Sequence, residues 1–149
     1  MKPRNQLVQL RRIAQIRDLQ CTGAQARTGE AAAVRGEAER ESAVEAEKLQ
    51  LVAEGWQAAL AAPMLAVDLL ALWSGELIRQ DDVRRDAESR LREAQAELDL
   101  RHGEWARALA CRDAAYEMTK AATRRHARAR EEKLLGDATD RHMHRRHAL

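Results

Sequence analysis

The chain shows its clearest pattern between Ala87 and Tyr116, where one set of positions recurs at alternating spacings of four and three residues. The set is mainly apolar and comprises Ala87, Leu91, Ala94, Leu98, Arg101, Trp105, Ala108, Arg112 and Ala115. Many of the residues between them are charged, and the stretch holds no proline and a single glycine, Gly103. This heptad pattern predicts a long helix with one narrow apolar stripe, which requires a partner helix.

A second ladder of the same kind precedes it and predicts a first helix over about residues 4–60. Its positions are Leu7, Leu10, Ala14, Arg17, Cys21, Ala24, Thr28, Ala31, Arg35, Ala38, Ser42, Glu45, Leu49, Val52, Trp56 and Ala59. Three glycines and several polar seam residues weaken its middle, so we expect bending or loose packing over residues 22–45. Ile13, Ile16 and Val34 lie off the ladder, which leaves a stutter in the register near the N-terminus as an alternative.

Together the two ladders predict a coiled-coil seam. Large residues predicted to form this seam include Leu49, Val52, Trp56, Leu91, Leu98 and Trp105.

The chain is expected to reverse at Pro63, because proline lacks the amide hydrogen that a helix interior needs and disfavours a helical residue before it. Reversal there places Trp56 opposite Leu70, Leu49 opposite Leu77, Cys21 and Ala24 opposite Trp105, and Leu10 opposite Tyr116. Turns at Ser74-Gly75 or at Gln80-Asp81-Asp82 are the alternatives, since both offer a capping side chain. With either of these, residues 64–73 form a short extra helix at the tip.

Composition supports long helices over a thick globular core. The 149 residues include no Phe, one Tyr and three Trp, and 34% are charged. We therefore predict an all-α fold, a long two-helix antiparallel coiled-coil hairpin that forms a single domain over residues 1–149. Its first helix spans residues 4–60, its reversal and tip residues 61–82, and its second helix continues to about residue 140 before a frayed basic tail. At 1.5 Å per residue the rod is on the order of 80–90 Å long.

Pairing of the two helices leaves a C-terminal helical overhang from about Lys120. It is basic through Arg124, Arg125, Arg128, Arg130, Lys133, Arg141, Arg145 and Arg146, whereas the whole chain has a net charge of only +2. Three interpretations stay open, namely a solvated frayed tail, a helix that docks on a protein, and a nucleic-acid contact. The absence of aromatic residues for base stacking makes nucleic acid the least favoured partner.

The most apolar run, residues 58–73, is too short to span a bilayer and is interrupted by Pro63 and Asp68, so we expect no transmembrane segment. In one interpretation its large side chains pack together to close the hairpin. In the other it is an exposed binding patch at the tip, formed by Leu65, Leu69, Leu72 and Trp73.

Candidate chemistry is sparse. No nucleotide-binding, metalloprotease or hydrolase motif occurs, and a two-helix hairpin offers no cavity that excludes water, so we expect no enzymatic activity and no cofactor. The two cysteines, Cys21 and Cys111, form no paired motif, which favours a reduced, cytoplasmic protein. His142, His144 and His147 are interpreted as part of an exposed basic tail, because the flanking arginines repel a metal cation. Arg11 and Arg12 interrupt the apolar N-terminal residues, so no signal peptide is expected.

The layout of one helix up, a break and a longer helix down resembles the FliJ/YscO-type stalk proteins of flagellar and virulence type III secretion systems. The resemblance extends to the segment Glu131-Glu132-Lys133-Leu134-Leu135-Gly136-Asp137. Glu131, Lys133 and Asp137 follow the Glu-x-Lys-x-x-Asp-like pattern of that family, with Gly136 as an additional residue before the aspartate.

This resemblance implies a cytoplasmic protein, peripheral to the inner-membrane secretion apparatus and similar to the coiled coil of the rotary ATPase gamma subunit. Such a stalk inserts its termini into a hexameric secretion ATPase and contacts the export gate and substrate chaperones. The implied ATPase-binding residues are Arg124, Arg125, Arg128, Arg130 and Lys133, and the implied gate-binding residues are those of the tip. A generic coiled-coil scaffold or adaptor is the alternative, followed by a nucleic-acid-binding coiled coil.

Overall fold

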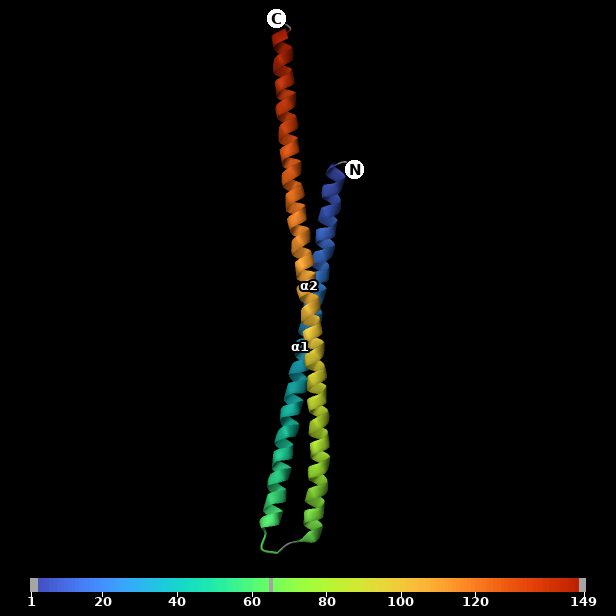
Figure 1. Cartoon of the computed structure of the whole chain (residues 1–149), viewed down its shortest axis with the longest axis vertical. Coiled ribbons are helices and arrows are strands. Elements are labelled where there is room, and N and C mark those ends of the chain that lie inside the picture. The colour runs from blue at the N-terminus through green and yellow to red at the C-terminus, as the bar shows by residue number, and fades with distance from the viewer. Residues whose placement is uncertain (1–2, 65, 148–149) are drawn as a thin grey trace. The chain divides into compact units, whose positions relative to one another are not determined.

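The computed structural model describes the backbone of residues 3–64 and 66–147 and the side chains of residues 5–64 and 66–143. It contains two helices, α1 (Pro3–Ala61) and α2 (Val67–His147), which can be followed in Figure 1. The two helices pack against each other in antiparallel orientation, and no strand occurs in the described ranges. The predicted all-α, two-helix hairpin is confirmed.

The turn lies at the first of the three predicted positions. Helix α1 ends at Ala61, two residues before Pro63, and α2 begins at Val67. The amide of Leu70 donates to the carbonyl of Ala66 over 3.1 Å, which closes the first turn of α2, and Asp68 places a negative charge at this helix N-terminus. Ser74-Gly75 and Gln80-Asp81-Asp82 lie inside α2, so the turn alternatives there and the separate tip helix are wrong.

Helix α2 continues to His147. It therefore runs beyond residue 140, through the segment that the sequence predicted as a frayed tail.

By packing, the chain divides into two compact units. The terminal unit comprises Met1–Ala24 and Trp105–Leu149, and the turn unit comprises Gln25–Glu104. Both helices contribute to both units, and a single coiled-coil domain over the whole chain stays a prediction.

In the turn unit the least exposed residues follow the predicted ladders. Thr28, Ala31 and Ala87 of these ladders are buried, and so is Gln80, which precedes the second ladder. The predicted seam residues Leu49, Val52, Trp56, Leu91 and Leu98 are half-buried. Trp73 also belongs to the seam and packs on Gly55, where an added Cβ would lie 2.5 Å from the Cη2 atom of the indole ring. The heptad pattern thus selects the side chains that face the partner helix.

In the terminal unit the seam passes through Ala14, Cys21, Ala24 and Ala115, all of them buried, and through the half-buried Trp105. The hydroxyl of Thr119 donates to the carbonyl of Ala115 over 2.8 Å and lies 3.4 Å from the carbonyl of Leu10. Leu10 therefore lies beside Thr119, whereas the predicted partner, Tyr116, is half exposed. The register differs because the turn occupies residues 62–66 and is not centred on Pro63 itself.

The expected loose packing over residues 22–45 is wrong at its start, since Ala24, Thr28 and Ala31 are all buried. Small side chains on both helices allow close approach, so packing offsets the low helix propensity of the glycines there. Ile13, Ile16 and Val34 are exposed, and the ladder holds without a stutter.

Candidate partner-binding surfaces

In the terminal unit α2 extends past the start of α1 (Figure 1). We define the overhang as residues 130–147 of α2, and its described side chains, residues 130–143, are all exposed. Lys133, Gly136 and Asp140 occupy the positions that would continue the seam, so the apolar stripe of α2 stops near the level at which α1 begins. Leu134 and Leu135 are adjacent large apolar residues on the overhang, and both side chains are exposed.

The five residues predicted at the ATPase end are all exposed, but they do not share one location. Arg130 and Lys133 lie on the overhang, and Arg128 lies just before it. Arg124 and Arg125 belong to the part of α2 that still runs beside α1, because residues of α2 as far as His126 and Ala129 line one groove together with Leu7 and Leu10 of α1. The unpaired segment therefore begins later than Lys120, a correction that follows from the shifted register.

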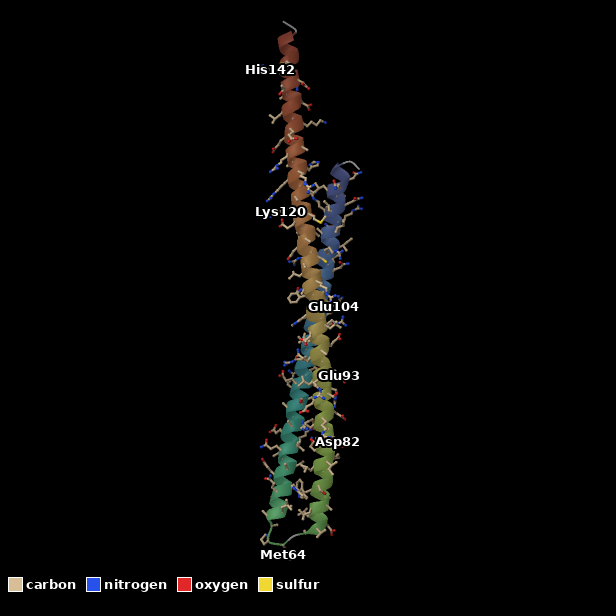
Figure 2. All side chains as sticks on the ribbon, viewed as in Figure 1. Met64, Asp82, Glu93, Glu104, Lys120 and His142 are labelled. Atoms are coloured by element: carbon tan, nitrogen blue, oxygen red, sulfur yellow. The ribbon has the colours of Figure 1, made fainter. Side chains whose placement is uncertain are left out.

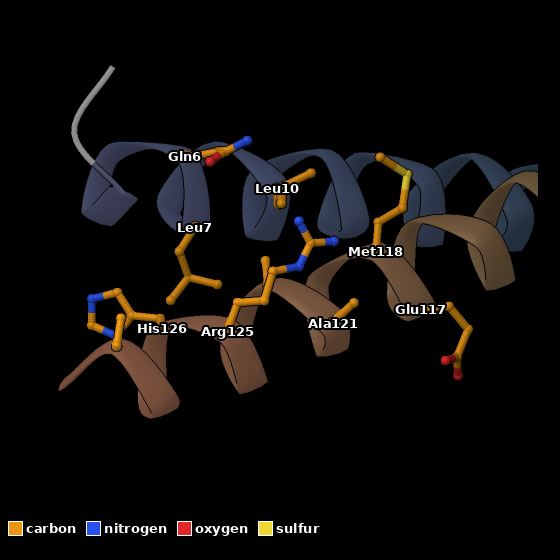
Figure 3. Close-up of a pocket in the computed structure, with 10 residues that line it drawn as sticks. Gln6, Leu7, Leu10, Glu117, Met118, Ala121, Arg125 and His126 are labelled. Carbon is orange, nitrogen blue, oxygen red and sulfur yellow. The ribbon is translucent and has the colours of Figure 1, made fainter. Parts of the chain in front are cut away.

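Beside these arginines the two helices leave an open groove of about 740 Å³, which we call the terminal groove (Figure 3). Its lining consists of Gln6, Leu7 and Leu10 of α1 and Glu117, Met118, Ala121, Ala122, Arg125, His126 and Ala129 of α2. In Figure 3 the side chains of Leu7, Met118 and Arg125 point into the space between the helices, whereas the carboxylate of Glu117 points away from it. No pattern in the sequence indicated this groove, because it depends on which residues of the two helices lie side by side.

At the turn the predicted tip residues divide into two groups. Leu69 and Leu72 are exposed by 46% and 68%, as a binding patch requires. Trp73 instead covers Gly55 and closes the hairpin, so its predicted role in an exposed patch is wrong. Leu65 lies outside the described residues. Met64, labelled in Figure 2, and Val67 are also highly exposed, and we call Met64, Val67, Leu69 and Leu72 the turn patch.

Polar side chains on the seam of the turn unit form hydrogen bonds between the helices. The Gln80 amide donates to the Glu45 carboxylate over 2.6 Å, and Lys48 donates to the same carboxylate over 2.7 Å. The bond from Lys48, followed by that from Gln80, lowers the pKa of Glu45. Thr28 donates to the Arg101 carbonyl over 3.2 Å, and Arg35 donates to Gln95 over 3.1 Å.

Such bonds stabilise one register of the two helices over others, because a shifted register would leave polar groups in the seam without partners. The signal in the sequence was the presence of polar residues at ladder positions, but their partners on α2 could not be assigned.

Among the side chains described, no group of three or more His, Cys, Asp or Glu residues is arranged to hold a metal ion. His144 and His147 of the predicted histidine cluster lie outside the described side chains. Cys21 is buried and Cys111 is exposed, and both are free thiols. Over the same part of the chain, neither helix includes a segment that is long and apolar enough to cross a membrane.

Comparison of the chain with family models, with curated proteins and with solved structures gave no match in any of the three.

Proposed function

We propose that this protein is a non-enzymatic central stalk of a type III secretion export apparatus. In this role it inserts into the hexameric secretion ATPase and couples that ATPase to the export gate, in the cytoplasm next to the inner membrane. The observation that carries the proposal is the C-terminal part of α2, which continues past the start of α1 and whose described side chains, residues 130–143, are all exposed and many of them charged. A hairpin of two equal helices has no such extension for a partner to enclose.

A second observation supports two different partners. The turn unit carries the turn patch, which is apolar, whereas the terminal unit carries Arg128, Arg130 and Lys133, which are exposed cations. Binding through exposed charges weakens with salt, because such charges are screened beyond about 8 Å at physiological ionic strength. Binding through apolar side chains is much less sensitive to salt. We assign the cations to the ATPase and the turn patch to the export gate, and substrate chaperones are further candidate partners.

The experiment measures binding of the full chain to the secretion ATPase and to the cytoplasmic domain of the export gate. A charge-reversed chain with Arg128→Glu, Arg130→Glu and Lys133→Glu should lose ATPase binding and keep gate binding. A chain with Leu69→Asp and Leu72→Asp should do the opposite. Trp73 is left unchanged, because it packs on Gly55 and its loss would weaken the hairpin.

A matched control reverses Arg40, Arg85 and Arg92, which are exposed arginines of the turn unit. If this control reduced ATPase binding as much as reversal at the overhang, the assignment would be wrong. If no variant changed binding to either partner, a generic coiled-coil scaffold would be the better interpretation.

A further inference from the structure

The terminal groove lies beside two stretches of the chain that are rich in basic residues, and Glu117 is the one carboxylate among its lining residues. The first 17 residues of the sequence include five basic and no acidic residues, and residues 118–130 of α2 likewise include five basic and no acidic residues. Among the described residues of these two stretches, Lys120 alone forms an ion pair. Its Nζ atom lies 3.5 Å from Oε1 of Glu117, which directly precedes the second stretch. Glu117 is thus engaged by Lys120 and points away from the groove (Figure 3). Of the residues that line the groove, Arg125 is thus the cation that points into it, and the basic residues of the two stretches make its surroundings electropositive.

The floor of the groove is apolar and incompletely covered. Leu7 and Leu10 occupy seam positions but are only half-buried, whereas Ala14, one turn further along the same seam, is 5% exposed. Opposite them α2 presents the small side chains of Ala121 and Ala122, which leave these leucines without a large partner. Met118 is 59% exposed at the edge of the groove, and methionine adapts readily to a partner surface.

We propose that the terminal groove binds an acidic amphipathic helix of a partner protein, as a third helix beside α1 and α2. Leucine-like side chains of that helix pack on Leu7, Leu10 and Met118, and its carboxylates pair with Arg125. The small residues Ala121, Ala122 and Ala129 allow its backbone to approach α2 closely. This site does not depend on the proposed stalk function.

The dimensions of the groove specify the ligand. The lining residues of α2 run from Glu117 to Ala129, which corresponds to about 18 Å of helix at 1.5 Å per residue. That length accommodates about three helical turns, so apolar anchors are expected at positions i, i+4 and i+7. Arg125 points into the groove and has no hydrogen-bond or ion-pair partner among the described residues, so it is available for a carboxylate.

The experiment uses the full chain and a fluorescein-labelled acidic peptide of about 14 residues, with leucines at the anchor positions and glutamates on the flanks. A control peptide keeps the leucines and replaces each glutamate with lysine. Anisotropy titrations should show that the acidic peptide binds and that the basic peptide does not. Raising the salt concentration should weaken binding without abolishing it, since the leucine contacts persist.

Two pairs of matched variants locate the site. Arg125→Glu should weaken binding of the acidic peptide about tenfold or more, whereas Arg130→Glu, on the same helix but outside the groove, should change it less than about twofold. Ala129→Trp should fill the groove and block binding, whereas Ala127→Trp, an exposed position outside the lining, should not. Far-ultraviolet circular dichroism should be the same for all four, because each position is exposed.

Other occupants give distinguishable results. If Arg125→Glu and Arg130→Glu reduced the affinity for the acidic peptide equally, the peptide would be attracted to basic residues in general and not to the groove. That result would overturn the proposal. Tighter binding of a single-stranded oligonucleotide than of the peptide, abolished by Arg125→Glu but not by Ala129→Trp, would replace it with a nucleic-acid site. A dimer in sedimentation that Ala129→Trp dissociates would identify a second copy of this chain as the occupant.

Discussion

The contact of Trp73 with Gly55 can be tested by adding a single methyl group. An ideal Cβ at Gly55 lies 2.5–2.8 Å from the Cη2, Cζ3 and Cζ2 atoms of the Trp73 ring, whereas ordinary contacts of this kind are 3.4–4 Å. In Gly55→Ala the ring or the helices must therefore move apart. Overpacking of this kind costs about 1–3 kcal/mol, while replacing a helical glycine with alanine contributes about 0.8–1 kcal/mol. The expected net result is a loss of up to about 2 kcal/mol in the free energy of unfolding.

Gly75→Ala is the matched control. Gly75 is also helical and belongs to the same unit, but apart from its chain neighbours and the backbone of its own helix nothing lies within 4 Å of its added Cβ. This change should therefore raise the free energy of unfolding by about 0.5–1 kcal/mol. In thermal melts followed by circular dichroism, each kcal/mol corresponds to about 2–4 °C for a chain of this size. The two variants should thus move the melting temperature in different directions.

A double-mutant cycle separates the ring contact from other effects of the methyl group. In a Trp73→Ala background the obstacle is gone, so Gly55→Ala should stabilise that chain by about as much as Gly75→Ala does. Trp73→Ala alone should lower the melting temperature, because it removes a large seam residue. If Gly55→Ala stabilised the unmodified chain as much as Gly75→Ala does, Trp73 would not pack on Gly55 and this register of the turn unit would be wrong.

Two further predictions concern the seam. Trp105→Ala should lower the free energy of unfolding by about 1.5–2.5 kcal/mol in urea denaturation, about half the usual cost for a fully buried tryptophan, and an unchanged value would place Trp105 off the seam. Because hydrogen bonds from Lys48 and Gln80 lower the pKa of Glu45, their stabilising effect is present above its ordinary value of 4.5 and is lost as the pH falls below it. Glu45→Gln should remove that part of the pH dependence of the free energy of unfolding. Identical profiles of this free energy against pH for the unmodified chain and for Glu45→Gln would contradict the prediction.

The sequence by itself was sufficient for the helices and their seam. Alternating spacings of three and four residues selected the buried face of both helices, because a helix of 3.6 residues per turn brings such positions onto one side. Pro63 marked the turn for a local reason, since proline has no amide hydrogen to donate and restricts the residue before it. These features depend on residues close together in the chain, so no knowledge of the partner helix was needed.

The pairing of the helices was decided only by the tertiary structure. A shift of about three residues moved Leu10 from Tyr116 to Thr119, and the heptad pattern cannot detect it, because a shift of this size again places seam positions opposite each other. The same shift extends the paired region beyond Lys120 and forms the terminal groove around Arg125. The exposure of Leu69 and Leu72, and the packing of Trp73 on Gly55, likewise depend on which side chain of α1 stands opposite. Contacts between residues distant in the chain result from the length and geometry of the turn, which the composition of either helix does not specify.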